Sequence, residues 1–406
     1  MSFQQGLSGL NAAARNLEVI GNNVANSGTI GFKGSRAQFA DIYANSLGSG
    51  GSGAVGIGTN LSRVAQQFSQ GNLTSTNNPL DIAINGEGFF RMSQSGTVAY
   101  SRNGQFELDK DGYIVNMAGA RLMGYPADAQ GNVAVGSPAD LRIDRGDLPP
   151  RVSTEALVVM NLDSRKAVLP AAGFNATNPT TYSGSTSMSV YDSLGNEHAV
   201  ALFFVKTAAN AWSVFASADG TALPAAVGQL NFASDGTIDT ATTTLPFNIS
   251  IPTTTGATTP LPVDFDFTGT TQFGSTTTVN QLTQDGYASG KITGFSVASD
   301  GTILGRYSNG KSLAQGQVAL ASFVDPQGLS PLGGNLWGET NASGQPLLGS
   351  PNSGSLGALQ GGALEESNVD LTAELVNMIT AQRVYQANAQ TIKTQDSVLQ
   401  TLVNLR

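Results

Sequence analysis

The chain has 406 residues, enough for two or three domains, and it lacks an apolar run of the roughly 20 residues that span a bilayer. Its formal net charge is −9, and 12% of its residues are charged, about half the share usual in soluble domains. An acidic, charge-poor chain argues against nucleic acid as a partner. One histidine, His198, and no cysteine argue against histidine-based catalysis and against metal sites built from these residues.

The first 28 residues predict a helix that packs against another helix. Apolar residues recur four and three apart, which places them on one narrow seam. Asn26-Ser27-Gly28 follows, and these residues tolerate the turn that ends a helix. The predicted seam consists of Phe3, Leu7, Leu10, Ala14, Leu17 and Val24, with Gly21 in the same register.

The last 39 residues carry the same spacing and contain no glycine or proline after Asn368. Ser367 or Asp370 can cap this helix, which would be on the order of 50 Å long at 1.5 Å per residue. Gln382 and Asp396 fill two gaps in the register. This second seam consists of Leu371, Leu375, Met378, Tyr385, Ala389, Ile392, Leu399 and Val403. Because each seam is too narrow for a helix that is stable alone, we expect the two helices to pack on each other and on neighbours.

Between the helices the sequence is typical of antiparallel β-structure. The period changes to two from Leu80, and strand-like runs alternate with turn signals such as Asp109-Lys110-Asp111-Gly112. Ser-Asp-Gly-Thr-Ile occurs at 234–238 and again at 299–303, which we interpret as repeated turn chemistry. The run of glycine and serine at 48–53 predicts a flexible hinge.

These patterns predict an α+β fold that is mostly β, with three nested layers. The long terminal helices form a coiled-coil-like assembly domain with a connecting segment, from residues 1–70 and 360–406. Residues 71–148 and 284–359 form a discontinuous antiparallel β domain. Residues 149–283, which begin at Pro149-Pro150, form an outer β domain inserted into the inner one.

Residues 305–312, Gly-Arg-Tyr-Ser-Asn-Gly-Lys-Ser, match the phosphate-binding P-loop pattern. A P-loop needs a strand before it and a helix N-terminus after it, because the backbone N–H groups of that turn hold the phosphates. Here Gly316 interrupts the expected helix, and Asn309-Gly310 between two strand-like runs predicts a hairpin instead. A nucleotide-binding enzyme is therefore the weakest of the alternatives.

Three other features that could indicate a binding or catalytic site are also explained by local structure. Residues 51–56 match a dinucleotide-binding pattern but lie in the flexible glycine run. Residues 264–269 begin like a calcium loop, but Ser275 stands where the bidentate glutamate is required. His198 follows a turn, and we expect it to point into solvent. We therefore predict no catalytic, cofactor-binding or metal-binding residues.

Several motifs resemble those of bacterial flagellar rod and hook subunits. The resemblance covers both ends of the chain and part of the first β segment, and it fades between about Pro149 and Asp285. Rod subunits are typically shorter and lack a large middle insertion, so the length favours a hook subunit over a distal rod subunit, the main alternative. The motifs are Ser8–Ala13, Gly21–Ser27, Gly31–Lys33, Asn85–Phe90, Tyr100–Phe106, Gly362–Asp370, Glu374–Ile379 and Gln382-Arg383.

The resemblance implies a structural, non-enzymatic subunit of the flagellar hook. Such subunits form a curved helical tube that acts as a universal joint and transmits torque from rod to filament. The implied location is the hook and basal body of the flagellum, outside the cell after type III export, without membrane insertion. No lysine or arginine precedes Arg15 and no apolar stretch follows it, so the sequence itself predicts no cleavable signal. The implied partners are further copies of the chain, the distal rod protein, the hook cap protein, the hook–filament junction proteins and the export apparatus.

Overall fold

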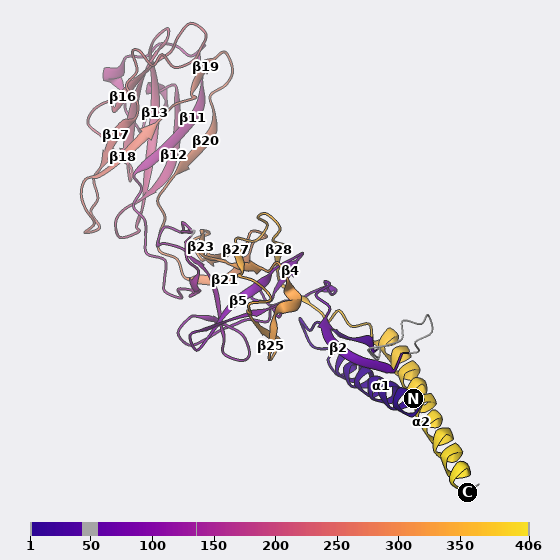
Figure 1. The fold of residues 1–406 in the computed structure, drawn as a ribbon. Coiled ribbons are helices and arrows are strands. Elements are labelled where there is room, and N and C mark those ends of the chain that lie inside the picture. The colour runs from indigo at the N-terminus through magenta and orange to yellow at the C-terminus, as the bar shows by residue number, and fades with distance from the viewer. Residues whose placement is uncertain (1, 43–55, 135, 405–406) are drawn as a thin grey trace. The chain divides into compact units, whose positions relative to one another are not determined.

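The computed structural model describes residues 2–42, 56–134 and 136–404, and the chain divides into two compact units, which Figure 1 shows. The first unit contains residues 1–145, 294–306 and 312–406, and the second contains residues 146–293 and 307–311. The predicted hinge at 48–53, and all but the last residue of the pattern at 51–56, lie outside the described residues. Neither described helix is long and apolar enough to cross a membrane.

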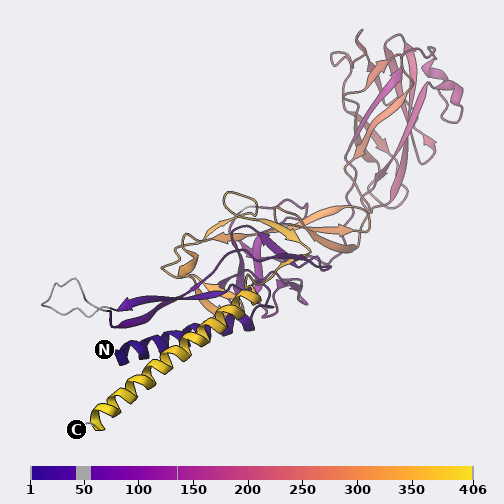
Figure 2. The same cartoon turned by 90° about the vertical axis from the view of Figure 1, so that its right-hand side faces the viewer.

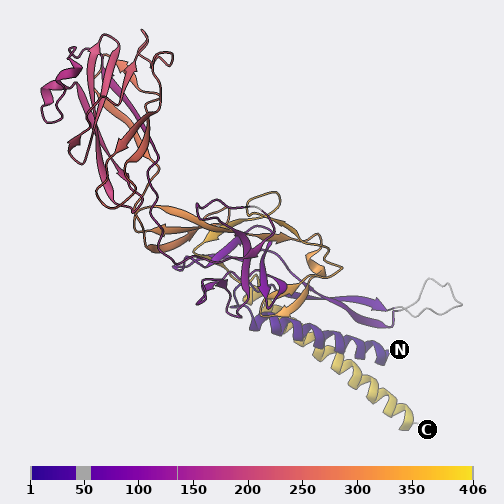
Figure 3. The same ribbon diagram turned by 90° about the vertical axis from the view of Figure 1, so that its left-hand side faces the viewer.

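The first unit begins and ends in a helix, in agreement with the spacing of the apolar residues. α1 spans Ser2–Ala25 and α2 spans Leu371–Asn404. The two helices run in opposite directions side by side, and α2 continues past the start of α1 (Figures 2 and 3). The first unit is therefore organised around one antiparallel helix pair with a free end.

A β-hairpin lies beside the helix pair, and a capping residue marks the start of α2. The strands β1 (Ser35–Ile42) and β2 (Gly58–Gln66) form an antiparallel hairpin beside the helices. The predicted cap at Asp370 is confirmed: its Oδ1 accepts hydrogen bonds from the N–H groups of Thr372 at 2.9 Å and Ala373 at 3.2 Å.

The rest of the first unit is an antiparallel β body. Its main sheet has the strand order β21-β22-β23-β9-β5-β6-β26-β25, so strands from both sides of the long insertion meet near its middle. Its core contains the fully buried Ile82, Phe90, Met92, Leu122 and Leu320. The elements are β3 (Leu73–Ser75), β4 (Ile82–Asn85), β5 (Phe89–Gln94), β6 (Thr97–Ser101), β7 (Glu107–Leu108), β8 (Ile114–Val115), β9 (Arg121–Pro126), β10 (Ala139–Asp140), β21 (Ile292–Val297), β22 (Thr302–Tyr307), β23 (Ser312–Val318), β24 (Leu320–Ser322), a 3₁₀ turn (Pro326–Gly328), β25 (Ser330–Gly333), β26 (Leu336–Gly338), β27 (Leu347–Gly349), β28 (Ala358–Gly361) and β29 (Ala363–Glu365).

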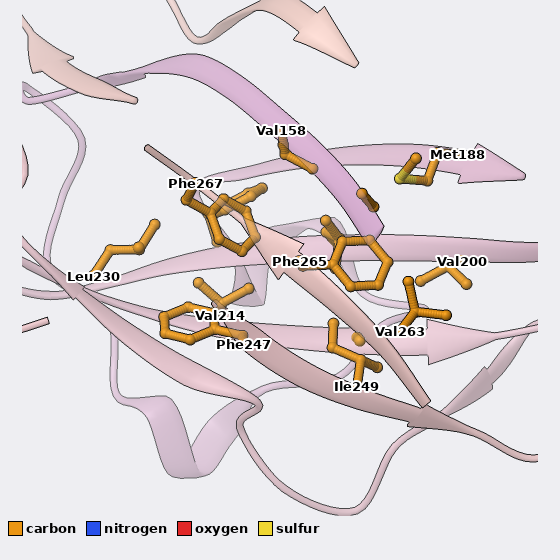
Figure 4. Close-up of a cluster of buried hydrophobic side chains, with 14 of the residues drawn as sticks. Val158, Met188, Val200, Val214, Leu230, Phe247, Ile249, Val263, Phe265 and Phe267 are labelled. Carbon is orange, nitrogen blue, oxygen red and sulfur yellow. The ribbon is translucent and has the colours of Figure 1, made fainter. Parts of the chain in front are cut away.

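The second unit is a sandwich of two five-stranded sheets, whose facing apolar side chains Figure 4 shows. Alternate residues of the long strands point into this core, among them Val158, Val200, Val214 and Phe265. One sheet contains β11 (Glu155–Asp163), β17 (Phe247–Ile251), β18 (Leu261–Asp266), β19 (Thr271–Phe273) and β20 (Thr278–Gln284). The other contains β12 (Gly184–Tyr191), β13 (Glu197–Ala208), β14 (Ala211–Ala218), β15 (Thr221–Ala222) and β16 (Gly228–Asn231), with 3₁₀ turns at Ala171–Gly173 and Pro179–Thr181.

The second unit departs from the predicted antiparallel arrangement at one strand. β11 pairs in parallel with both β18 and β19, and antiparallel with β20. A parallel pair requires a long crossover between its strands, and here the whole second sheet lies in the connection from β11 to β18. The fold class is otherwise the predicted one, mostly β with two terminal helices.

Many β-turns of both units share one hydrogen-bonding motif. An aspartate or asparagine accepts the N–H groups two and four residues later, and the glycine three residues later has a positive φ, 84° at Gly112 and at Gly195. The motif begins at Asp109, Asn116, Asp128 and Asp192. In the repeated Ser-Asp-Gly-Thr-Ile, Asp235 and Asp300 each accept the N–H of the threonine two residues later, which confirms repeated turn chemistry.

The sequence at 305–312 forms a hairpin, as predicted, and not a P-loop. β22 and β23 are antiparallel, and Gly310 has φ +77° in the turn between them. Asn309 Nδ2 donates to the carbonyl of Ala288 at 2.7 Å, and Lys311 Nζ lies 5.6 Å from the ring centroid of Tyr287. A strand follows this loop in place of the helix N-terminus that a phosphate site requires.

Lys311→Ala is therefore expected to change the free energy of unfolding by about 0.5 kcal/mol or less, because it removes one weak cation–π contact. Asn309→Ala, its neighbour, should cost about 1 kcal/mol through the lost hydrogen bond. Urea unfolding of the purified variants measures the two changes in the free energy of unfolding, and ATP titration measures nucleotide binding. ATP binding by the unaltered chain that Lys311→Ala abolishes would contradict the hairpin interpretation.

The expectation that His198 points into solvent is wrong. The side chain is 4% exposed and lies between Asp219, whose Oδ2 is 2.7 Å from Nδ1, and Asp192, whose Oδ2 is 3.3 Å from Nε2. Burial lowers the pKa of His198, but the hydrogen bonds to Asp219 and Asp192 outweigh it and raise the pKa above 6.5. The turn after β12 therefore supplies a partner for the histidine rather than exposing it.

Candidate assembly surface of the terminal helices

The contact between α1 and α2 is made by small residues. A methyl group at Gly6 would lie 3.2 Å from Cγ1 of Ile392, and one at Gly9 would lie 2.8 Å from Oδ1 of Asn388. Further along α1, Ala13 and Ile20 are 6% and 5% exposed. The two helices therefore approach each other closely at these glycines, and a side chain at either position would have to displace that of Ile392 or Asn388.

The predicted seam of α1 lies beside this buried stripe and not on it. The buried Gly6, Ala13 and Ile20 each precede a seam position by one residue, which is about 100° around a helix. Phe3 and Leu7 are 46% and 44% exposed. The other four predicted residues, Leu10, Ala14, Leu17 and Val24, are half-buried.

The predicted seam of α2 is divided in the same way. Met378, Ala389 and Ile392 are half-buried, whereas Leu371, Leu375, Tyr385 and Leu399 are exposed; the side chain of Val403 lies outside the described residues. Ala381, which the prediction did not include, is buried. Four further apolar residues of α2 are about half exposed: Val376, Ile379, Val384 and Val398. Apolar surface thus remains on both helices after they have packed on each other.

Two asparagines fasten the ends of the helices to the hairpin. Asn23 exchanges two hydrogen bonds of 2.8 Å with the backbone of Ser35 and donates to Oε1 of Glu374 at 3.2 Å. Asn368 accepts the N–H of Gly34 at 2.8 Å and donates to the carbonyl of Gln67 at 2.7 Å. The C-terminal end of α1 and the N-terminal end of α2 are therefore fixed to the same strands.

A buried charge cluster of Lys33, Arg102 and Glu365 joins both chain ends to the β body. Lys33 Nζ lies 2.6 Å from Oε1 of Glu365, and Arg102 Nη1 lies 3.5 Å from Oε2; the side chains are 0%, 4% and 0% exposed in the order named. Glu365 Oε1 also accepts the N–H of Gly71 at 2.9 Å. Burial lowers the pKa of both Lys33 and Arg102, although Glu365 opposes this shift in each.

The sequence patterns do not predict this cluster. Its three residues belong to three separate motifs of the resemblance, Gly31–Lys33, Tyr100–Phe106 and Gly362–Asp370. Because charged residues are scarce in the chain, the presence of one inside each of these motifs is the feature of the sequence that could have indicated the cluster. Among the described residues no group of three or more histidines, aspartates and glutamates is arranged to hold a metal ion.

Four family models match successive parts of the chain. In chain order they are described as flagella basal body rod protein (residues 3–33), flagellar hook protein FlgE/F/G D1 domain (83–149), flagellar basal body protein FlaE D2 domain (161–287) and flagellar basal body rod FlgEFG protein C-terminal (360–405). The first and last matches fall on α1 and α2. The third falls within the second unit.

Curated proteins match over the full length. Flagellar hook protein FlgE of Escherichia coli (strain K12) is 42% identical over 415 residues, and that of Salmonella typhimurium (strain LT2) is 43% identical over 416, with 100% of each chain covered. Flagellar hook protein FlgE2 of Helicobacter pylori, a solved structure, shares the fold with a TM-score of 0.54 at 13% identity, over 71% of this chain and 99% of that one. From the full-length similarity at 42% and 43% identity, the chain belongs to the flagellar hook protein family.

Proposed function

We propose that this chain is the structural subunit of a bacterial flagellar hook and polymerises into a helical tube. The observation that carries this function is the full-length similarity to flagellar hook proteins, which includes the second unit as well as the two termini. The tube is curved and acts as a universal joint that transmits torque from rod to filament. The same similarity places the chain in the flagellum, at the hook and basal body.

The terminal helices hold the tube together through the predicted seams. Exposed residues of these seams, such as Phe3, Leu7 and Leu375, give each copy apolar surface that its own helix pair leaves uncovered. Burial of such surface on neighbouring copies favours association by about 25 cal/mol per Å². Beyond its own copies, we propose the distal rod protein, the hook cap protein and the hook–filament junction proteins as neighbours, and type III export as the route.

We propose a structural and not an enzymatic role for the chain, and the full-length similarity to flagellar hook proteins supports the structural role. A distal rod subunit is the alternative, and the second unit argues against it. Electron microscopy of the purified chain, polymerised in salt, tests the proposal. Curved tubes are the expected result, straight rods would favour the rod alternative, and the absence of polymer at every salt concentration would contradict the proposal.

Removing the second unit gives a prediction of its own. Its two ends are adjacent, because the N–H of Leu148 donates to the carbonyl of Gly290 at 2.8 Å and that of Arg151 to Tyr287 at 3.0 Å. A short linker in place of residues 149–283 should therefore leave the first unit folded, as for an inserted domain. We expect polymer with altered curvature, and the loss of all polymer would count against the layered organisation.

A further inference from the structure

A groove lies between α1, the hairpin and the first half of α2, all within the first unit. Its volume is about 740 Å³. Its lining mixes small apolar side chains, such as Ala13, Ile20 and Ala381, with polar ones, such as Asn377 and Glu374. A groove of this composition can receive an apolar side chain together with a hydrogen-bond donor.

One polar atom of the groove lacks a partner. Glu374 accepts a hydrogen bond from Asn23 at Oε1, but its Oε2 is buried and has no hydrogen-bond partner among the described residues. An unsatisfied buried carboxylate oxygen is costly, about 1–3 kcal/mol or more. The geometry therefore favours an occupant that brings a donor to Glu374.

The other end of α2 carries the complementary feature. Near its start, α1 meets α2 at Gly6, which faces Ile392, and α2 then continues past the start of α1 (Figure 2). Leu399 lies seven residues after Ile392, on the same helix face, and is 54% exposed. The contact stripe of the helix pair thus extends to Leu399, where α1 does not cover it. Gln395, four residues before Leu399, offers an amide donor on this face.

We infer that residues 395–401 of a second copy occupy this groove, with Leu399 against its apolar residues and the amide of Gln395 donating to Glu374. The chain's own tip cannot fill it, because Glu374 and Leu399 are about 37 Å apart along one helix at 1.5 Å per residue. The contact joins unlike surfaces, the tip of one copy and the base of the next. Such a head-to-tail contact leaves a free tip and a free groove on each pair of copies, and it extends into a helical polymer where the rotation between copies does not close a ring. The inference rests on the proposed polymerisation and assigns one of its contacts.

Engineered cysteines test the contact, because the chain has none of its own. Asn377→Cys places a thiol in the groove and Asp396→Cys places one at the tip, three residues before Leu399. Both positions are exposed, so the substitutions should leave the fold intact, and Leu399 itself is retained. The double variant is polymerised, oxidised and run on a non-reducing gel. We expect a ladder of multimers from the polymer and none from dilute monomer. Each single variant, treated in the same way, is the control and should give no ladder.

Two outcomes would overturn the inference: tubes of the double variant without cross-links, or cross-links that stop at a dimer. Either would leave the proposed function intact, whereas the failure of the unaltered chain to polymerise would refute the function itself.

A charge variant gives a second measurement. Gln395→Glu sets a carboxylate against Glu374 and should raise the critical concentration for polymerisation about tenfold or more, equivalent to 1.4 kcal/mol. Gln400→Glu, on another face, should change it little.

Discussion

Glu365→Ala is expected to lower the free energy of unfolding of the first unit by about 3 to 5 kcal/mol. The substitution leaves Lys33 and Arg102 buried without the carboxylate that pairs with both, and removal of one partner of a buried ion pair is strongly destabilising for that reason. Glu365→Gln keeps the shape of the side chain and should lose most of the same free energy, because the lost charge and not the lost volume dominates.

Urea unfolding followed by tryptophan fluorescence measures this loss. The chain has two tryptophans, Trp212 in the second unit and Trp337 in the first, so a Trp212→Phe background reports the first unit alone. Glu366→Ala is the matched control: this neighbour is half-buried and uses its backbone N–H, bonded to Asn72, to hold its place. Equal stability of the Glu365 and Glu366 variants would refute the role of the buried charge cluster.

The elements of the first unit could be predicted from local spacing, but the packing of the helices could not. The four-and-three spacing identifies both helices, and the turn and capping residues correctly mark the end of α1 and the start of α2. It does not identify the face that packs, because the contact is made by Gly6 and Gly9, which add nothing to an apolar pattern. Close approach through small residues leaves the larger Phe3 and Leu7 outside the contact. The role of the predicted seams in the polymer stays a prediction.

Ion pairs between residues far apart in the chain could not be predicted, for a different reason. Glu365 is 332 residues from Lys33 and 263 from Arg102, and no periodicity links positions so far apart. The same holds for the second unit, where the turn beside His198 predicts an exposed side chain but says nothing of its distant partner. Its partner Asp219 is 21 residues away, directly after the next strand, β14. Turns, by contrast, depend on residues two to four apart and were predicted well.

The second unit is expected to lose stability as the pH rises above about 6.5. The raised pKa of His198 means that its stabilising contribution is fully present below about pH 6.5, the unfolded value, and is lost as the pH rises through the folded value. The carboxylates act in the opposite range: hydrogen bonds from His198 hold the pKa of Asp219 below 3.8, so its contribution is lost only in acid. At pH values between the acidic and the alkaline loss, the ion pairs of His198 with Asp219 and Asp192 are intact.

His198→Ala should therefore cost about 3 kcal/mol at pH 6 and less at pH 9, and it should remove this alkaline loss of stability. The cost is at the lower end for a broken buried pair, because Asn196 and Thr255 still donate to the buried Asp192. Thermal unfolding at both pH values, followed through Trp212 in a Trp337→Phe background, measures the effect. Asp219→Asn, at a half-exposed carboxylate, is the control and should cost less at pH 6. An alkaline loss of stability that persists unchanged in His198→Ala would show that another group causes it, because the charge on the imidazole is then absent at every pH.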